Sequence, residues 1–251
     1  MPDDALRRAL AEQPGRPLIT QYDDRTGERV ELSVATVENW VAKTANLLQE
    51  AAVEPGAVAT VLLPAHWQTA VILLGCWRAG VAVEYSPVGV AVDDYAVRRT
   101  TAGEVNADVV FVAADRIEEA PAADEIWALS LAPMAAPLRE VPKGASDYAV
   151  EVRGQGDRFT PYAPVDAAGP GLTAAGLTLA DLVDRGRAEA AELGLEPGGR
   201  LLVDTDETRQ PSPVGWLLAP LVANASLVLL RHPDPAGIDR IASTERITTR
   251  L

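Results

Sequence analysis

One arrangement of helices and strands occurs twice in this sequence and constrains its fold more than any other feature. In each copy, a Ser or Thr precedes an amphipathic helix, the tripeptide Glu-Pro-Gly follows the helix, and an apolar strand, a second helix and a second strand come next. The first copy covers residues 33–85 and the second covers residues 178–230. Continuous apolar runs such as residues 57–63 are typical of strands buried in a parallel sheet. The alternation of helices with such strands therefore predicts an α/β fold.

The two copies define the expected domain organisation. Residues 113–169 lie between them and combine many prolines with a less regular hydrophobic pattern. We therefore expect two Rossmann-like subdomains with mostly parallel sheets, residues 1–145 and residues 146–251, packed into one compact unit. Two such halves create a cleft, which is where small-molecule sites usually form. The short amphipathic segments 6–10 and 238–241 are expected to dock on this unit. The expected helices are 34–49, 66–79, 93–105, 179–193 and 214–222, and the expected strands are 57–63, 81–85, 108–112, 125–129, 200–203 and 227–230.

Composition excludes several classes of protein. The formal net charge of −14 argues against a nucleic-acid partner, because binding of phosphates requires Lys and Arg. Cys76 is the single cysteine, which excludes a disulfide framework and a cysteine-based zinc cluster, and its apolar helix favours packing over nucleophilic reactivity. Residues 210–230 carry no charge, but their prolines favour a helix and a strand over a membrane span. We expect a cytoplasmic, soluble protein. Lys43 and Lys143 are the only lysines, a composition typical of GC-rich, actinobacterial genomes.

Several motifs of the first copy resemble a known family. They are Leu32-Ser33 before the helix, Val53-Glu-Pro-Gly56, Val61-Leu-Leu-Pro64, and the segment Trp77-Arg-Ala-Gly80-Val-Ala-Val83 through Pro87. In this order they resemble the opening of the large domain of AMP-dependent acyl-CoA synthetases, the acyl-adenylate-forming enzymes. The second copy resembles the part of the same domain that follows its phosphate-binding loop. The resemblance covers most of residues 15–232 and implies a shortened large domain with AMP or ATP as its cofactor.

The phosphate-binding loop of that family has a degenerate counterpart here. The family's loop is rich in Ser, Thr and Gly and ends in Pro-Lys, so that backbone N–H groups and the lysine offset phosphate charge. Residues 162–176 retain Gly169, Gly171 and Thr173, but no lysine follows, and Asp166 would repel a phosphate. A weak AMP or ATP site is one interpretation of this stretch, and a surface turn rich in Gly and Pro is the other.

Other candidate ligand groups are acidic side chains and histidines. Asp204, Asp206 and Glu207 follow a predicted parallel strand, where α/β proteins place functional groups. They would bind a ligand or Mg²⁺ through oxygen atoms, or form an ordinary solvated loop, and we predict no dedicated metal site. His66 and His232 are the only histidines and are expected at ends of elements that face the cleft, as candidate bases or as capping residues.

The resemblance also implies chemistry that this sequence does not provide. The family's later adenine and magnesium segment, its ribose-binding aspartate and its small domain with the catalytic lysine have no counterpart before Leu251. We therefore predict no catalytic residues and a non-catalytic protein, a pseudoenzyme, that binds an unknown small molecule or a protein partner and that is a candidate homo-oligomer. The alternative is a ligase-like protein that retains nucleotide or acyl binding and is completed by another chain. A cleft lined by Gly169, Gly171 and Asp204 would favour ligand binding there, and a cleft filled by Trp or Leu would contradict it.

Overall fold

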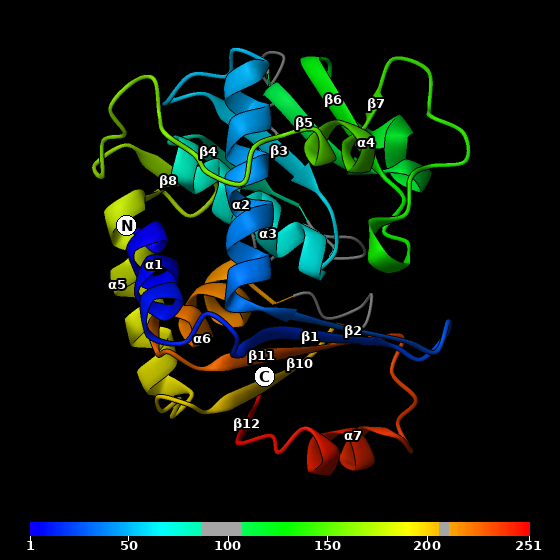
Figure 1. Ribbon diagram of the computed structural model, residues 1–251, viewed down its shortest axis with the longest axis vertical. Coiled ribbons are helices and arrows are strands. Elements are labelled where there is room, and N and C mark those ends of the chain that lie inside the picture. The colour runs from blue at the N-terminus through cyan, green and yellow to red at the C-terminus, as the bar shows by residue number, and fades with distance from the viewer. Residues whose placement is uncertain (87–106, 206–210) are drawn as a thin grey trace.

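The computed structural model describes residues 1–86, 107–205 and 211–251. Within these ranges the chain forms two β-sheets with helices packed on them and between them, one sheet in the upper half and one in the lower half of Figure 1. Most strand pairs are parallel. The predicted α/β fold with mostly parallel sheets is therefore confirmed.

The lower sheet, called sheet A, has five strands in the order β12-β10-β11-β1-β2. Its strand β1 pairs in parallel with β11 and antiparallel with β2. Strand β10 pairs in parallel with β11 and with β12. The bounds of these strands are Pro17–Asp23 for β1, Glu28–Ser33 for β2, Arg200–Asp204 for β10, Ser226–Arg231 for β11 and Thr249–Arg250 for β12.

The upper sheet, called sheet B, has seven strands in the order β7-β6-β5-β3-β4-β8-β9. All its neighbours are parallel except β8 and β9, which form an antiparallel hairpin at one edge. The bounds are Val58–Leu62 for β3, Ala82–Tyr85 for β4, Ala107–Ala113 for β5, Ala123–Leu129 for β6, Ser146–Asp147 for β7, Pro170–Leu172 for β8 and Leu177–Thr178 for β9.

The helices cover the faces of the two sheets. Their bounds are Pro2–Glu12 for α1, Val34–Glu50 for α2, Trp67–Ala79 for α3, Tyr148–Arg153 for α4, Leu179–Glu192 for α5, Ala219–Val222 for α6 and Ile238–Thr244 for α7. Two 3₁₀ turns, η1 (Ala114–Glu119) and η2 (Pro133–Ala135), and a π-helical turn, η3 (Val214–Leu218), complete the described elements. None of the helices in the described ranges combines the length and the hydrophobicity that a membrane span requires.

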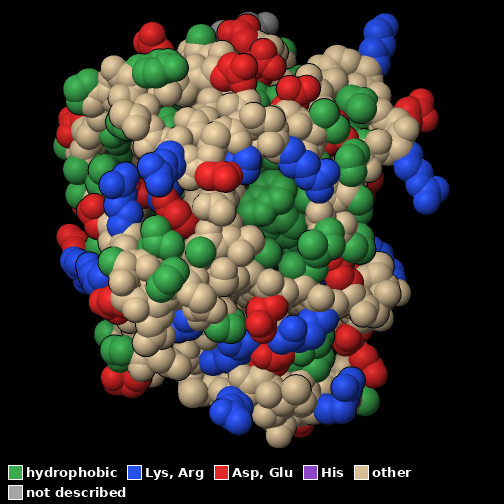
Figure 2. Space-filling view, viewed as in Figure 1, with side chains coloured by type: hydrophobic (Ala, Val, Ile, Leu, Met, Phe, Trp, Pro, Cys, Tyr) green, Lys and Arg blue, Asp and Glu red, His purple; other side chains and the backbone are tan. Residues whose placement is uncertain are grey.

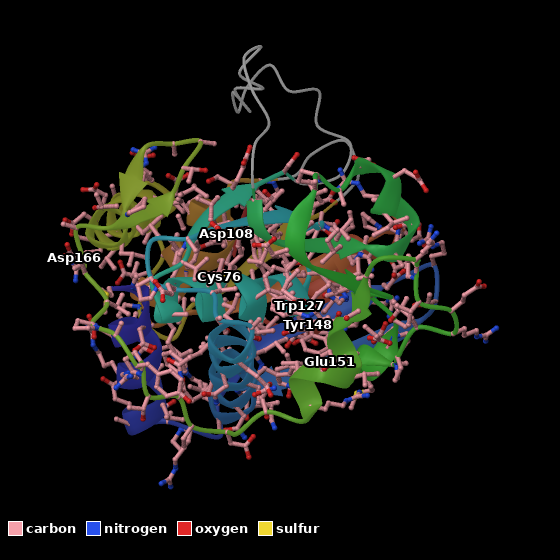
Figure 3. The ribbon with its side chains drawn as sticks, turned by 90° about the horizontal axis from the view of Figure 1, so that it is seen from above. Cys76, Asp108, Trp127, Tyr148, Glu151 and Asp166 are labelled. Carbon is pink, nitrogen blue, oxygen red and sulfur yellow. The ribbon has the colours of Figure 1, made fainter. Side chains whose placement is uncertain are left out.

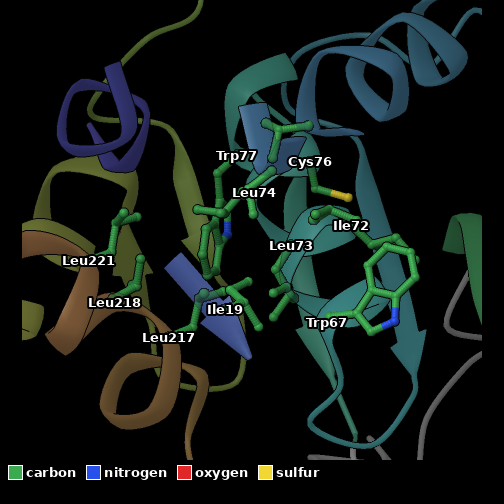
Figure 4. Packing of buried hydrophobic residues seen from close by; sticks show 14 of the residues in the cluster. Ile19, Trp67, Ile72, Leu73, Leu74, Cys76, Trp77, Leu217, Leu218 and Leu221 are labelled. Atoms are coloured by element: carbon green, nitrogen blue, oxygen red, sulfur yellow. The ribbon is translucent and has the colours of Figure 1, made fainter. Parts of the chain in front are cut away.

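Helix α3 forms the centre of the molecule, and every one of its residues is buried. Its Leu74 and Trp77 face Leu217 and Leu221 from η3 and α6, with Ile19 of β1 beside them (Figure 4). The void at this contact has a volume of about 10 Å³, enough for a single water at most. The cleft expected between the two halves is thus filled here by leucine and tryptophan side chains, because the residues that α3 presents at this contact are apolar.

The repeat seen in the sequence is present in the backbone. In the first copy, Gly56 N donates to Gly80 O (2.8 Å), and in the second, Gly198 N donates to Asn224 O (3.0 Å). Both turn glycines have positive φ, +95° for Gly56 and +78° for Gly198, which favours glycine. The second helix of the second copy differs from the expected regular helix, because it begins with the π-helical turn η3.

The sheets take strands from both sides of residue 145. Strands β1 and β2 precede that residue and belong to sheet A, while β7, β8 and β9 follow it and belong to sheet B. The reason is that β1 pairs with β11, some two hundred residues later in the chain. The division into folding units at residues 145 and 146 stays a prediction. The expected helix 93–105 lies outside the described residues.

Three of the described α-helices, α1, α4 and α7, were not assigned from the sequence or were only outlined. Helix α4 packs on sheet B through Tyr148, whose ring lies 5.9 Å from that of Phe111 and whose hydroxyl lies 2.7 Å from Thr44 Oγ1. Helix α1 docks through Asp3, which binds the buried Arg78 of α3. Helix α7 docks on sheet A through Ile241. The expected docking of the two terminal segments is therefore confirmed.

Candidate functional site

The counterpart of the phosphate-binding loop is the hairpin of β8 and β9. Its turn consists of residues 173–176, and Gly176 has a φ of +63°. Leu172 and Leu177 face each other across the strands, so the turn is short and tight. Strand β8 also pairs with β4 through Leu172 and Val83, which fixes the hairpin to the edge of sheet B.

The polar groups of this hairpin and of the residues before it form hydrogen bonds with other groups of the protein. Gly169 N donates to Asp166 O and Gly176 N donates to Thr173 O, both at 3.0 Å. Thr173 donates to Val83 O twice, from its backbone N (3.0 Å) and from its hydroxyl (3.2 Å). Figure 3 places Asp166 at the outer edge of the molecule, away from α3. The N–H groups of Gly169, Thr173 and Gly176 therefore act as internal donors.

Gly171 has a packing role. A Cβ atom at this position would lie 2.7 Å from Leu182 Cδ1 and 3.1 Å from Leu179 N, so only glycine allows α5 to pack this closely. Its carbonyl oxygen accepts a hydrogen bond from the buried Trp77 Nε1 at 2.9 Å. These contacts match the interpretation of this stretch as a turn. Nucleotide binding by Gly169, Gly171 and Thr173 stays a prediction.

Asp204, the acidic candidate that the structure describes, does not lie near the hairpin. Asp204 ends β10 in sheet A, whereas the hairpin lies at the far edge of sheet B (Figure 1). Asp206, predicted together with Asp204 as a ligand or metal group, lies outside the described residues. Across the parts of the chain that are described, no group of three His, Cys, Asp or Glu side chains is placed to hold a metal ion. The structure thus does not bring Asp204 together with Gly169 and Gly171.

A polar cluster lies where the parallel strands β1 and β11 end. Asp23 Oδ1 lies 3.0 Å from His232 Nδ1, and Asp23 Oδ2 lies 3.6 Å from Arg231 Nη1. The amide of Arg25 donates to the same carboxylate at 3.0 Å. Burial alone would raise the pKa of Asp23, but the hydrogen bond from His232 and the charge of Arg231 hold it below its usual value. Asp23 is therefore a buried carboxylate anchored by cationic and N–H donors.

His66 follows β3 of sheet B and caps the start of α3. Its Nδ1 accepts a hydrogen bond from Gln68 N at 3.1 Å, so the alternative of a capping role is confirmed. The side chain is fully buried. Burial lowers the pKa of His66 well below its usual value, and the positive charge of Arg231 lowers it further. The imidazole is consequently neutral at physiological pH.

The sequence interpretation missed Gln21, a buried polar residue of β1 that contacts the start of α3. Gln21 lies within β1, is 1% exposed, and accepts a hydrogen bond from Trp67 N through Oε1 at 2.9 Å. A glutamine next to the apolar run Leu18-Ile19 of a buried strand is the signal that could have identified it. Gln21 and His66 together satisfy the first two amide groups of α3.

Exposed apolar surface marks sites of interaction with other proteins. Figure 2 shows hydrophobic side chains gathered in a hollow beside α2, with charged side chains distributed around it. Of the large hydrophobic residues that are described, few are exposed, and the most exposed are Tyr162 (88%) and Met134 (71%). These two residues lie on separate loops of the segment that joins the two copies.

Comparison with known proteins agrees with these observations. The profile of a family described as AMP-binding enzyme matches residues 6–159, more than half of the chain. A TIGR03089 family protein of Mycobacterium tuberculosis is 39% identical over 250 residues, which cover 96% of this chain and 94% of that protein. The crystal structure of a Brucella canis acyl-CoA synthetase shares the fold, with a TM-score of 0.75 and 16% identity. The match covers 98% of this chain but 46% of the synthetase, so the chain spans less than half of that protein's length. The resemblance inferred from the sequence motifs is confirmed, and the chain belongs to the AMP-binding enzyme family.

Proposed function

We propose that this protein is a non-catalytic member of the family, which binds a small ligand at the carboxyl ends of its strands and does not activate acids with ATP. The observation that carries the proposal is the hairpin of β8 and β9. A phosphate-binding loop works because its backbone N–H groups and lysine point at the phosphates. Here the N–H groups of Gly169, Thr173 and Gly176 donate to carbonyl oxygens of the protein itself. Residues 162–178 also contain no lysine.

Ligand binding at the carboxyl ends of the strands is supported by the polar cluster described above. Open α/β sheets bind ligands beyond the carboxyl ends of their strands. In sheet A, Asp23 and Arg231 occupy the ends of two adjacent parallel strands. His66 lies where the chain enters α3 after β3 of sheet B. The charge of Arg231 contributes to the lowered pKa of His66, so the two residues lie near each other although they belong to different sheets.

The alternative function is retained nucleotide binding, and one set of experiments separates the two. Pyrophosphate exchange with ATP and a mixture of carboxylic acids measures acid activation, and thermal unfolding with ATP–Mg²⁺, AMP and CoA measures binding. A ligand at 100 times its dissociation constant stabilises a protein by about 2.7 kcal/mol, which raises the melting temperature visibly. We expect no exchange and no stabilisation by ATP–Mg²⁺.

The variant Thr173→Ala provides the internal control. Its hydroxyl is exposed to the hairpin turn and donates only to Val83 O. If ATP bound through the hairpin, this variant would weaken the ATP-induced shift while the shift with other ligands stayed the same. ATP-dependent pyrophosphate exchange by the wild-type protein would overturn the proposal and establish the ligase-like alternative.

A further inference from the structure

Side chains accept hydrogen bonds from the first two backbone amides of α3. The leading N–H groups of a helix have no partner within the helix and carry its positive dipole end. Here Gln21 Oε1 accepts from Trp67 N at 2.9 Å, and His66 Nδ1 accepts from Gln68 N at 3.1 Å. The helix has 13 residues, so its dipole is fully developed. The side chains around this turn therefore determine what else it can bind.

Three side-chain nitrogen atoms are buried without a hydrogen-bond partner among the described residues. Two belong to the first turn of α3, and the third belongs to the residue of β1 that binds its first amide. They are Gln21 Nε2, Trp67 Nε1 and Gln68 Nε2. Their side chains are almost fully buried, with exposed fractions of 1%, 2% and 1%. The bond from Trp67 N to Oε1 fixes the orientation of the Gln21 amide, so Nε2 is the end left over. Each is a donor, and native proteins leave few buried donors unpaired, because a buried donor without a partner loses the hydrogen bonds it made with water.

The ligand must supply hydrogen-bond acceptors, because the three unpartnered atoms are donors, and the dipole at the start of α3 favours an acceptor with negative charge. His66 is neutral, because burial lowers its pKa and the positive charge of Arg231 lowers it further. The described acids that interact with Arg231 are Asp23, Glu28 and Asp115. Of these, Asp23 is also bound by His232 and the amide of Arg25. The side chains of Arg231 and His232 are 15% and 20% exposed, so the edge of this cluster meets solvent.

We propose that the first turn of α3 binds a small anion through Gln21, Trp67 and Gln68, with the anion supplying carboxylate or phosphate oxygens. This inference rests on the proposed function and names the chemical class of its ligand. The three nitrogens donate to the oxygens of the anion, and the dipole of α3 stabilises its charge. The site lies at the start of α3 and is separate from the hairpin of β8 and β9.

Thermal unfolding of the whole protein in acetate or phosphate, at millimolar concentration and with chloride holding the ionic strength constant, tests the site. We expect a saturable rise in melting temperature with one of the two anions, and the comparison of acetate with phosphate identifies the oxygen group. Gln68→Met removes one donor without leaving an amide unpaired, so the variant should unfold at a higher temperature than wild type but bind the anion about tenfold or more weakly.

Two further variants make the result specific. Trp67→Phe keeps an aromatic ring against Trp40 and removes the indole N–H, so it should also weaken anion binding about tenfold. Thr60→Val is the matched control, because it removes another buried, unpartnered polar atom from β3 and should bind the anion like wild type. If neither anion gives a saturable shift, the donors bind water and the inference is wrong. Unchanged binding by Gln68→Met and Trp67→Phe would overturn it as well. Pyrophosphate exchange reports separately on the proposed function, so the two can fail independently.

Discussion

The first and second copies of the helix–strand–helix–strand unit share the same backbone hydrogen bonds but differ in their side chains. In both copies, the residue that follows the second helix's terminal turn donates back into that helix, Val81 N to Cys76 O and Ala225 N to Pro220 O, each at 2.8 Å. The first helix of each copy begins at a hydroxyl cap, Ser33 or Thr178. The shared backbone explains why the two halves look alike in the sequence.

The second helices differ, and the candidate chemistry follows that difference. Helix α3 of the first copy is regular and starts with the polar residues His66 and Gln68. In the second copy the equivalent start is the π-helical turn η3 after Pro213, whose first amide is satisfied by Ser212 Oγ at 3.2 Å. Among the described residues that begin these two helices, His66 and Gln68 of the first copy are buried and polar, whereas Val214 and Gly215 of the second copy are apolar. The two copies therefore share a backbone arrangement, and the side chains at equivalent positions determine which copy could bind a ligand.

The largest expected effect concerns a buried arginine that only the first copy has. Arg78 of α3 binds Glu38 through two hydrogen bonds (2.7 and 2.6 Å) and Asp3 at 2.5 Å, and its side chain is 3% exposed. The second copy has Val222 near the same place. Arg78→Met removes the partner of the largely buried Glu38 carboxylate and leaves Asp3 with only the exposed Arg7, so it should lower the free energy of unfolding in urea by about 3–5 kcal/mol.

The control for Arg78 is an exposed ion pair of the second copy. Arg187 and Asp184 of α5 are 61% and 76% exposed, so Arg187→Met should change the free energy of unfolding by less than about 1 kcal/mol. A loss below 1 kcal/mol in Arg78→Met would mean that α1 is not held to the first copy by this network.

The next effect compares how the two helix pairs cross. In the first copy, a Cβ at Gly75 of α3 would lie 2.7 Å from Thr44 Cβ of α2, and in the second, a Cβ at Gly186 of α5 would lie 3.2 Å from Leu218 Cβ. Gly75→Ala should destabilise the protein by about 2 kcal/mol through overpacking. In Gly186→Ala the milder crowding is offset by about 1 kcal/mol of helix propensity, so stability should barely change. Equal urea midpoints for the two variants would contradict this difference in helix packing.

A pH titration addresses the polar start of α3. The pKa of His66 is lowered in the folded state, so the unfolded chain binds more protons below pH 6.5 and stability falls as the pH falls. The slope reaches about 1.4 kcal/mol per pH unit. His66→Asn keeps a good N-cap without a titrating ring and should be nearly insensitive to pH from about 6.5 to 5. A parallel decline in both proteins, measured by urea unfolding at each pH, would exclude His66 as the source.

Much of this fold could be predicted from the sequence, because its determinants are local. The caps Ser33 and Thr178, the apolar run of β3 and the stop at Gly80 are each set by neighbouring residues, and the structure confirms them. The placement of β1 beside β11 was not predicted, because it depends on pairing between segments some two hundred residues apart. A strand's hydrophobic pattern says that it is buried but does not name its neighbour.

The candidate site was harder to predict for the same reason. Glycines were interpreted from their similarity to a phosphate loop, but the role of Gly171 is set by Leu182 and Trp77, which only the fold brings to it. Gln21 became significant only when its contact with Trp67 at the start of α3 was known. Side chains whose partners lie far away in the chain have no local signature, even when their residue types suggest polarity.

The smallest expected effect tests whether the two Glu-Pro-Gly turns are equivalent. Gly56 and Gly198 both have positive φ, and no atom lies within 4 Å of a Cβ built on either, so strain of the left-handed backbone is the only cost of a side chain. Gly56→Ala and Gly198→Ala should each lower the free energy of unfolding by about 1–2 kcal/mol, and by the same amount. The two variants share a control, Gly27→Ala, because Gly27 also has a positive φ (+73°) and open space but lies outside both copies. Equal losses in all three variants would indicate backbone strain alone. A larger loss at Gly56 than at Gly198 would show that the turn of the first copy also positions α3. The hydrogen bond of this turn would then contribute more to stability in the first copy than in the second.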